Sequence, residues 1–72
     1  MVFDEFYKHL GKRIKILREE KHLTQEKLAE KAGISLDYLG KVEVNINRPG
    51  LKTLLKLARA LEISMEELFK TL

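Results

Sequence analysis

Polar and charged side chains are predicted on one side of a short helix over about residues 35–44. Leu39 and Val42 recur on its inner face. The opposite face then carries Ser35, Leu36, Asp37, Gly40, Lys41 and Val44. Lys41 and Ser35 can each reach guanine acceptors or a phosphate. Asp37 can accept a hydrogen bond from a cytosine amino group, and Leu36 can touch a thymine methyl. This is the chemistry of a surface that contacts nucleic acid.

A second short helix and a tight turn precede this segment. Thr24 can cap a helix over residues 25–31, and Gly33 supplies the left-handed backbone conformation that ends it. Ser35 then starts the next helix as its N-cap. Two helices with so short a connector must cross at a steep angle, which is the helix-turn-helix arrangement. Such a unit places its second helix in the major groove of DNA.

Three further helices are predicted around this pair. The first spans about residues 4–21 and carries one apolar stripe. Gly11 in its interior indicates close packing, because glycine weakens a helix. The fourth spans about residues 51–61, and the fifth opens at Ser64 with a capping-box pattern. The expected stripe of the first helix is Phe6, Leu10, Ile14 and Leu17, and that of the fourth is Leu51, Leu54, Leu55, Ala58 and Leu61. Short connectors between these helices predict an all-α fold, a compact five-helix bundle.

Composition restricts the classes of function. The 72 residues form a single predicted domain, residues 1–72, with a net charge of +3 that favours an anionic partner. Cysteine is absent, which excludes thiolate metal sites, and His9 and His22 are too few for a metal cluster, so neither metal nor cofactor is expected. No stretch approaches the roughly 20 apolar residues that span a bilayer, and no signal peptide is seen, so a cytoplasmic protein is expected.

Two runs of residues resemble a known family. They are LGKRIKILREEKHLTQEKLAEKAGIS and, further along, LLKLARALEISMEELF. Together they are similar to the Cro and phage-repressor type of helix-turn-helix domain over about residues 10–69. The resemblance implies a lambda-repressor-like bundle with the helix-turn-helix at helices 2 and 3. It also implies operator binding as a dimer by a small transcriptional regulator, more often a repressor.

The resemblance implies further contacts to the DNA backbone. Gln25 matches the glutamine that opens the family's second helix, where its amide can donate to a phosphate, and Thr24 lies beside it. In the loop after the recognition helix, Asn45, Asn47 and Arg48 match the family's polar groups, although Asn45 stands where glycine is common. The alternative is that these side chains only cap a helix or face solvent. Gly40 has two explanations as well: tolerated helix weakness or close approach to the duplex.

Two predictions concern packing and assembly. Arg18 and Glu43 match a pair that bridges the first and third helices of the family, and we interpret both as structural. A homodimer on a palindrome is expected because one small domain reads too few base pairs. The candidate interface residues are Met65, Leu68, Phe69 and Leu72, with Val2, Phe3, Tyr7 and Ile16 as further apolar positions. Each can instead complete the monomer's core.

Two other classes of function compete with DNA binding. An antitoxin or adaptor-type protein-interaction module shares this fold, and the outward face of residues 35–44 lacks the glutamine, arginine and asparagine common in the family. An enzyme is not expected, because Ser35 and Ser64 look like caps and no cysteine nucleophile or glycine-rich phosphate loop is present.

Overall fold

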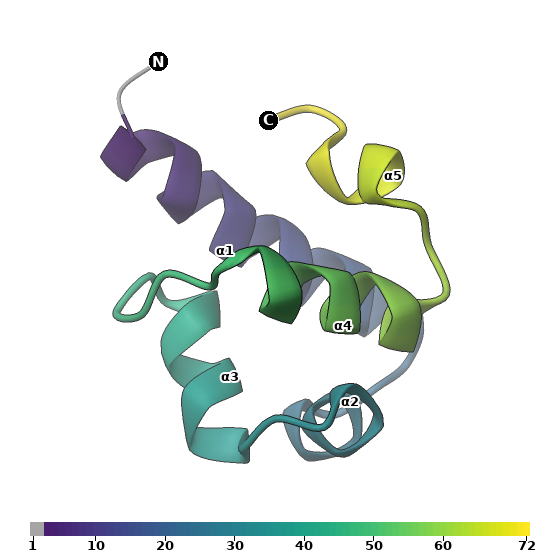
Figure 1. Cartoon of the computed structure of the whole chain (residues 1–72). Helices are drawn as coiled ribbons and strands as arrows, with labels where there is room; N and C mark the ends of the chain where they lie inside the picture. Colours follow the sequence, from purple (N-terminus) through teal and green to yellow (C-terminus); the bar gives the residue numbers. More distant parts are fainter. Residues whose placement is uncertain (1–2) are drawn as a thin grey trace.

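Five helices fold around one core in the computed structural model, which describes residues 3–72 (Figure 1). They are α1 (Phe3–Glu20), α2 (Gln25–Ala32), α3 (Leu36–Glu43), α4 (Leu51–Leu61) and α5 (Met65–Phe69). The predicted all-α fold is confirmed, and the predicted helix ends agree to within one residue. Over the described residues, no helix combines the length and the apolar character that crossing a membrane requires.

Three of the helices start at a side-chain cap. The hydroxyl oxygens of Thr24, Ser35 and Ser64 each accept a hydrogen bond of 3.0 Å from the backbone N–H three residues later. These bonds satisfy N–H groups that have no partner inside the helix. The predicted starts of α2, α3 and α5 are therefore confirmed at the level of individual hydrogen bonds.

Left-handed residues end the first four helices. Gly33, with φ of 71°, ends α2 as predicted. Three other helix ends use His22, Asn45 and Glu62, with φ of 58°, 64° and 59°. At each of the four ends the next residue's N–H reaches back to a carbonyl five residues earlier, as from Ile46 to Lys41 at 2.8 Å. This pattern closes the helix and turns the chain sharply.

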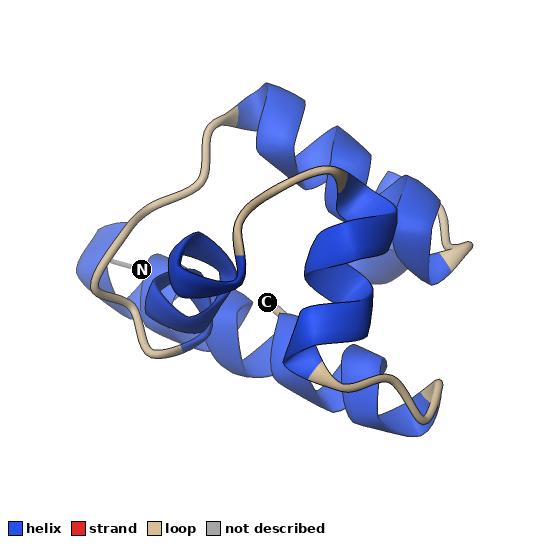
Figure 2. Cartoon of the chain, turned by 90° about the horizontal axis from the view of Figure 1, so that it is seen from below, coloured by secondary structure: helices blue, strands red, loops and turns tan. Residues whose placement is uncertain are grey.

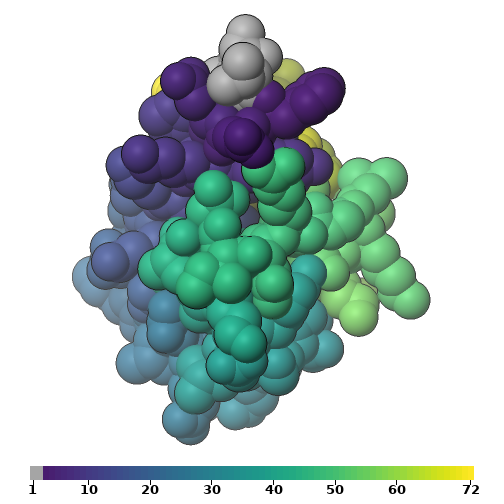
Figure 3. Space-filling model, turned by 90° about the vertical axis from the view of Figure 1, so that its left-hand side faces the viewer, coloured from purple at the N-terminus to yellow at the C-terminus, as the bar shows by residue number. Residues whose placement is uncertain are grey.

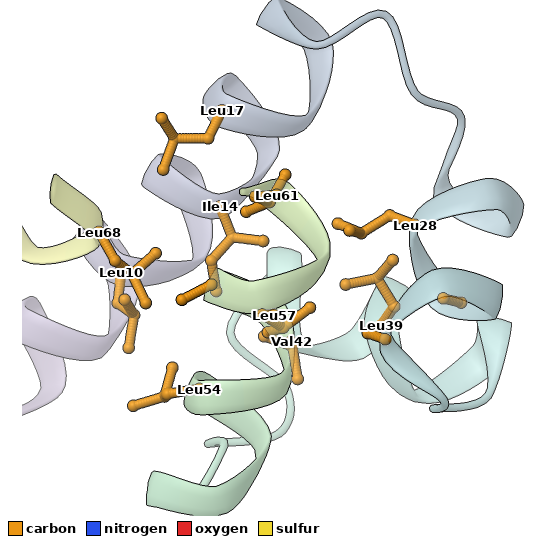
Figure 4. Packing of buried hydrophobic residues seen from close by; sticks show 13 residues of the cluster. Leu10, Ile14, Leu17, Leu28, Leu39, Val42, Leu54, Leu57, Leu61 and Leu68 are labelled. Carbon is orange, nitrogen blue, oxygen red and sulfur yellow. The ribbon is translucent and has the colours of Figure 1, made fainter. Parts of the chain in front are cut away.

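The core gathers leucine side chains from all five helices (Figure 4). Its largest fully buried side chains are Leu10, Ile14, Leu28, Leu39, Val42, Leu57, Leu61 and Leu68. The predicted stripe of α4 was wrong at two positions, because Leu51 and Leu55 are 67% and 50% exposed. Leu57, which was not predicted, is buried in their place. Leu55 lies about 100° of helical rotation past Leu54, outside the buried arc, and Leu51 sits at the exposed start of the helix.

Gly11 brings α1 against the end of α3. A Cβ atom at this position would lie 2.6 Å from the carbonyl oxygen of Val42 and 2.9 Å from that of Glu43. Such distances are shorter than van der Waals contact, so a side chain would push the two helices apart. The predicted close packing is confirmed. α2 packs against α3 and α4, and α1 also packs against α3, so α3 is held next to α2 at one side of the bundle (Figure 1, and from below in Figure 2).

Candidate nucleic-acid interface

The outer side of α3 is open, and its inner side is buried. Leu39 and Val42 are 0% and 1% exposed, as predicted. Of the outward set, Gly40 is half-buried, and the exposed members are Ser35, Leu36, Asp37, Lys41 and Val44. Figure 3 shows this face of the molecule, with α3 in teal below the green loop that follows it. The structure therefore presents α3 as a rod that is covered by its own chain on one side.

Two of the side chains predicted to contact DNA bind each other. The Lys41 ammonium lies 3.0 Å from the Asp37 carboxylate, one helical turn away in α3, and both side chains are exposed. An acid one turn before a lysine is the favourable order on a helix. The carboxylate then lies toward the positive N-terminal end of the helix dipole, and the ammonium lies toward the negative C-terminal end. The free protein thus neutralises the positive charge that α3 would bring to a phosphate.

A buried ion pair fixes α3 from behind. The Arg18 guanidinium donates to both carboxylate oxygens of Glu43, at 2.8 and 3.1 Å, so the predicted pair is present. Arg18 also donates to the carbonyl oxygen of Leu23 at 2.8 Å. The hydrogen bond to Glu43 raises the pKa of Arg18 against the opposing effect of burial, so the guanidinium stays charged. Two parallel bonds of this kind restrict how α3 can rotate relative to α1.

Gln25 joins this buried network from the start of α2. Its Nε2 donates to a Glu43 carboxylate oxygen at 3.0 Å. The side-chain amide also borders Gly40, where an added Cβ would lie 3.9 Å from its oxygen. That is ordinary van der Waals contact, so the packing of this chain does not require glycine at position 40. Thr24, immediately before Gln25, is exposed and caps the helix.

The loop from residue 44 to residue 50 is tied back to the bundle. Asn45 adopts the left-handed conformation that its side chain tolerates, and Asn47 donates its backbone N–H to the Lys41 carbonyl oxygen. Arg48 points to α1, where it forms an ion pair with Asp4 and places its guanidinium 4.8 Å from the centre of the Tyr7 ring. Sequence reasoning missed both partners of Arg48, because nothing local links the first turn of α1 to this loop.

The predicted dimer surface is largely part of the monomer's core. Leu68 is 0% exposed, so its assignment as an interface residue was wrong: α5 folds back on α1 and buries it. Met65, Phe69 and Leu72 are half-buried against the same core, with the Phe69 ring centre 6.0 Å from that of Phe6. Tyr7 is half-buried, Phe3 and Ile16 are exposed, and Val2 lies outside the described residues.

Neither histidine contributes to a metal-binding arrangement in the described part of the chain. His9 and His22 are both exposed. From residue 3 to residue 72, no three His, Cys, Asp or Glu side chains gather in a way that could hold a metal ion. The exposed side chains on the outer face of α3 and its flanking loop are instead the polar or charged Ser35, Asp37, Lys41 and Arg48 and the apolar Leu36, Val44 and Ile46.

Comparison with known proteins identifies the family. A family model described as Helix-turn-helix matches residues 14–68. The immunity repressor protein of Bacillus phage phi105 is 46% identical over 56 residues, which are 78% of this chain and 39% of the repressor. The transcriptional regulator SinR of Bacillus subtilis is 38% identical over 60 residues, 82% of this chain and 54% of SinR. The chain thus spans about half or less of the length of these relatives.

Solved structures share the same architecture. The restriction-modification controller protein C.AhdI from Aeromonas hydrophila superposes with a TM-score of 0.85 at 40% identity, covering 93% of this chain and all of C.AhdI. SinR, solved in complex with DNA, superposes with a TM-score of 0.79 at 37% identity over 85% of this chain and 98% of the SinR chain. This chain belongs to the family of Cro and phage-repressor type helix-turn-helix domains.

Proposed function

We propose that this chain binds double-stranded DNA in a sequence-specific manner and acts as a small transcriptional repressor. The observation that carries the proposal is the open outer face of α3, held in orientation from behind by Arg18 and Glu43. A short helix presented in this way fits the major groove of B-form DNA. Relatives named as repressors and regulators, and the SinR structure with DNA, support the same function.

The start of α2 is the proposed anchor on the DNA backbone. Gln25 uses Nε2 to bind Glu43, but a side-chain amide nitrogen carries two hydrogens. The second hydrogen is available to a phosphate, next to the free N–H groups and positive partial charge at the start of the helix. Thr24, Asn45, Asn47 and Arg48 are the further proposed backbone contacts. These contacts would set the register in which α3 meets the bases.

We propose that two copies act together on a palindromic operator. α3 is eight residues long, so one copy reaches few base pairs. Two copies related by a two-fold axis place two such helices in successive major grooves, about 34 Å apart along the DNA. With two half-sites, the preference of each α3 helix for its own base pairs is multiplied. One copy of this domain contacts too few base pairs to reach the same sequence specificity.

Selection of bound sequences from a random duplex pool tests this function. We expect recovery of an inverted repeat whose half-sites are centred about 10 base pairs apart. Affinity for the selected site should fall on the order of a thousandfold between 50 and 200 mM salt, because phosphate contacts release counterions. Recovery of no common sequence, or an affinity that does not respond to salt, would contradict the proposal.

Variants then test the docking face. The double variant Lys41→Ala, Gln25→Ala should weaken binding to the selected site by roughly tenfold or more, since it removes two of the proposed contacts. Lys70→Ala is the matched control, because it removes an equal charge beyond α5, away from α3 (Figure 1). Equal losses in the two proteins would mean that only net charge matters, and α3 would not be the docking element.

A further inference from the structure

Both cationic side chains among the proposed DNA contacts are occupied by carboxylates of their own chain. Lys41 pairs with Asp37 inside α3, at 3.0 Å. Arg48 pairs with Asp4, which lies 44 residues earlier in the first turn of α1. The first pair is local to one helix and follows from helical spacing. The second joins two distant segments, so only the fold creates it.

The surroundings of Arg48 combine a fixed position with an exchangeable partner. Tyr7 lies one turn after Asp4 on α1, and its ring holds the guanidinium from one side at 4.8 Å. The Asp4 side chain is 81% exposed and that of Arg48 is 45% exposed. A cation over an aromatic ring is held without using its hydrogen-bond donors. An exposed ion pair contributes little, so another anion can replace the carboxylate at small cost.

The pair also lies beside the proposed DNA-contacting face. Figure 3 shows the first turn of α1 in purple directly above the green loop, with α3 in teal below it. Arg48 belongs to that loop, and its guanidinium contacts Asp4 and Tyr7 of α1. A phosphate that approaches the Arg48 guanidinium would be repelled by the Asp4 carboxylate, which is already in contact with it.

We propose that Asp4 is an internal stand-in for a DNA phosphate. In the free protein it occupies the donors of Arg48, and on binding Arg48 exchanges Asp4 for a backbone phosphate while Tyr7 keeps the guanidinium in place. Asp4 therefore lowers the affinity for any duplex and makes binding depend more on the contacts of α3. This inference rests on the proposed function and adds a residue that tunes it.

The test compares two neutral substitutions in the same helical turn. Asp4→Asn removes the carboxylate that faces Arg48, and Glu5→Gln removes the neighbouring charge, which forms no ion pair among residues 3–72. Binding to a fluorescent duplex of unselected sequence is measured by anisotropy at 50 mM salt. We expect Asp4→Asn to bind about two- to fivefold more tightly than Glu5→Gln, the range for release of an exposed pair. In an Arg48→Ala background this difference should disappear.

A measurement without DNA separates this inference from the function on which it rests. The NMR signal of the Arg48 side-chain Nε–H should shift in Asp4→Asn and stay in place in Glu5→Gln. If the unmodified chain binds duplex DNA but Asp4→Asn and Glu5→Gln bind equally, the role of Asp4 is wrong and the function stands. The role is also wrong if the difference persists without Arg48. If the unmodified chain binds no duplex, the function fails and the phosphate exchange with it.

Discussion

The two sides of α3 use the same kind of charge pair in opposite ways. Behind the helix, Arg18 and Glu43 expose 9% and 1% of their side chains and share two hydrogen bonds. In front, Lys41 and Asp37 expose 45% and 78% and share a single contact. The pair of Arg18 and Glu43 is shielded from solvent, and its two hydrogen bonds fix the relative position of the two side chains. The pair of Lys41 and Asp37 stays hydrated, so its partners can separate at little cost.

This difference assigns a separate task to each side. A buried pair adds little net stability over an apolar pair, but it strongly penalises any arrangement that leaves one charge alone. It therefore specifies the orientation of α3 relative to α1. The exposed pairs specify no orientation, because their partners can separate at little cost. The back of α3 thus fixes its orientation, and the front stays exposed, as the proposed DNA contact requires.

The largest expected effect comes from removing one member of the buried pair. Glu43→Ala leaves the Arg18 guanidinium buried without its carboxylate, which should cost about 3–5 kcal/mol of unfolding free energy. Asp37→Ala removes the acid of the exposed pair and should cost about 1 kcal/mol or less. Urea denaturation followed by circular dichroism measures both. Similar losses in the two variants would show that burial does not distinguish the pairs.

A smaller effect is expected from the glycine at the junction of α1 and α3. Gly11→Ala places a methyl group against the carbonyl oxygens of Val42 and Glu43, so overpacking should cost about 1–3 kcal/mol. Gly40→Ala is the matched control, since it also replaces a helical glycine but finds room, and it should stabilise by about 0.5–1 kcal/mol. Thermal denaturation of both variants gives the sign of each effect. A stabilising Gly11→Ala would contradict the close contact.

Gly40→Ala also decides between the two explanations for that glycine. Unchanged affinity for the selected DNA site would identify it as tolerated helix weakness. A loss of affinity in this more stable variant would show that the duplex approaches the backbone of α3 at this point, where a methyl group is in the way. Because the two readouts are independent, a change in stability cannot be mistaken for a change in docking.

The smallest effect on stability is expected at the front of α3. Lys41→Ala should change the unfolding free energy by less than about 1 kcal/mol, because the exposed pair with Asp37 contributes little. The same variant should weaken binding to the selected site by about 1–2 kcal/mol. Lys70→Ala again serves as the control for charge alone. A variant that lost stability and kept its affinity would reverse the tasks assigned to the two sides.

Local signals predicted most of the fold. Thr24, Ser35 and Ser64 each satisfy N–H groups within three residues, and Gly33 adopts a conformation that few other residues tolerate. Such signals depend only on residues within about one helical turn, so they can be recognised without knowledge of the tertiary contacts. The pair of Arg18 and Glu43 was predicted from the family resemblance, since its members are 25 residues apart.

Burial was harder to predict than helix position. Leu51 and Leu55 fit the apolar spacing of α4, yet the core contacts only the arc that holds Leu54, Leu57 and Leu61. Leu68 was assigned to a dimer surface because the sequence alone does not show that α5 folds back over α1. In both cases the error concerns which neighbours cover a side chain. Periodicity predicts an apolar face but not its partner.

What the sequence by itself determined is the set of helices, their caps, the turn at Gly33 and the outward position of Lys41 on α3. These follow from hydrogen bonds and rotations within a few residues of chain. Only the tertiary structure decided that Asp4 and Tyr7 meet Arg48 and that Gln25 joins Arg18 on Glu43. Those contacts depend on how whole helices pack, because a side chain finds a distant partner only after the core has placed both segments.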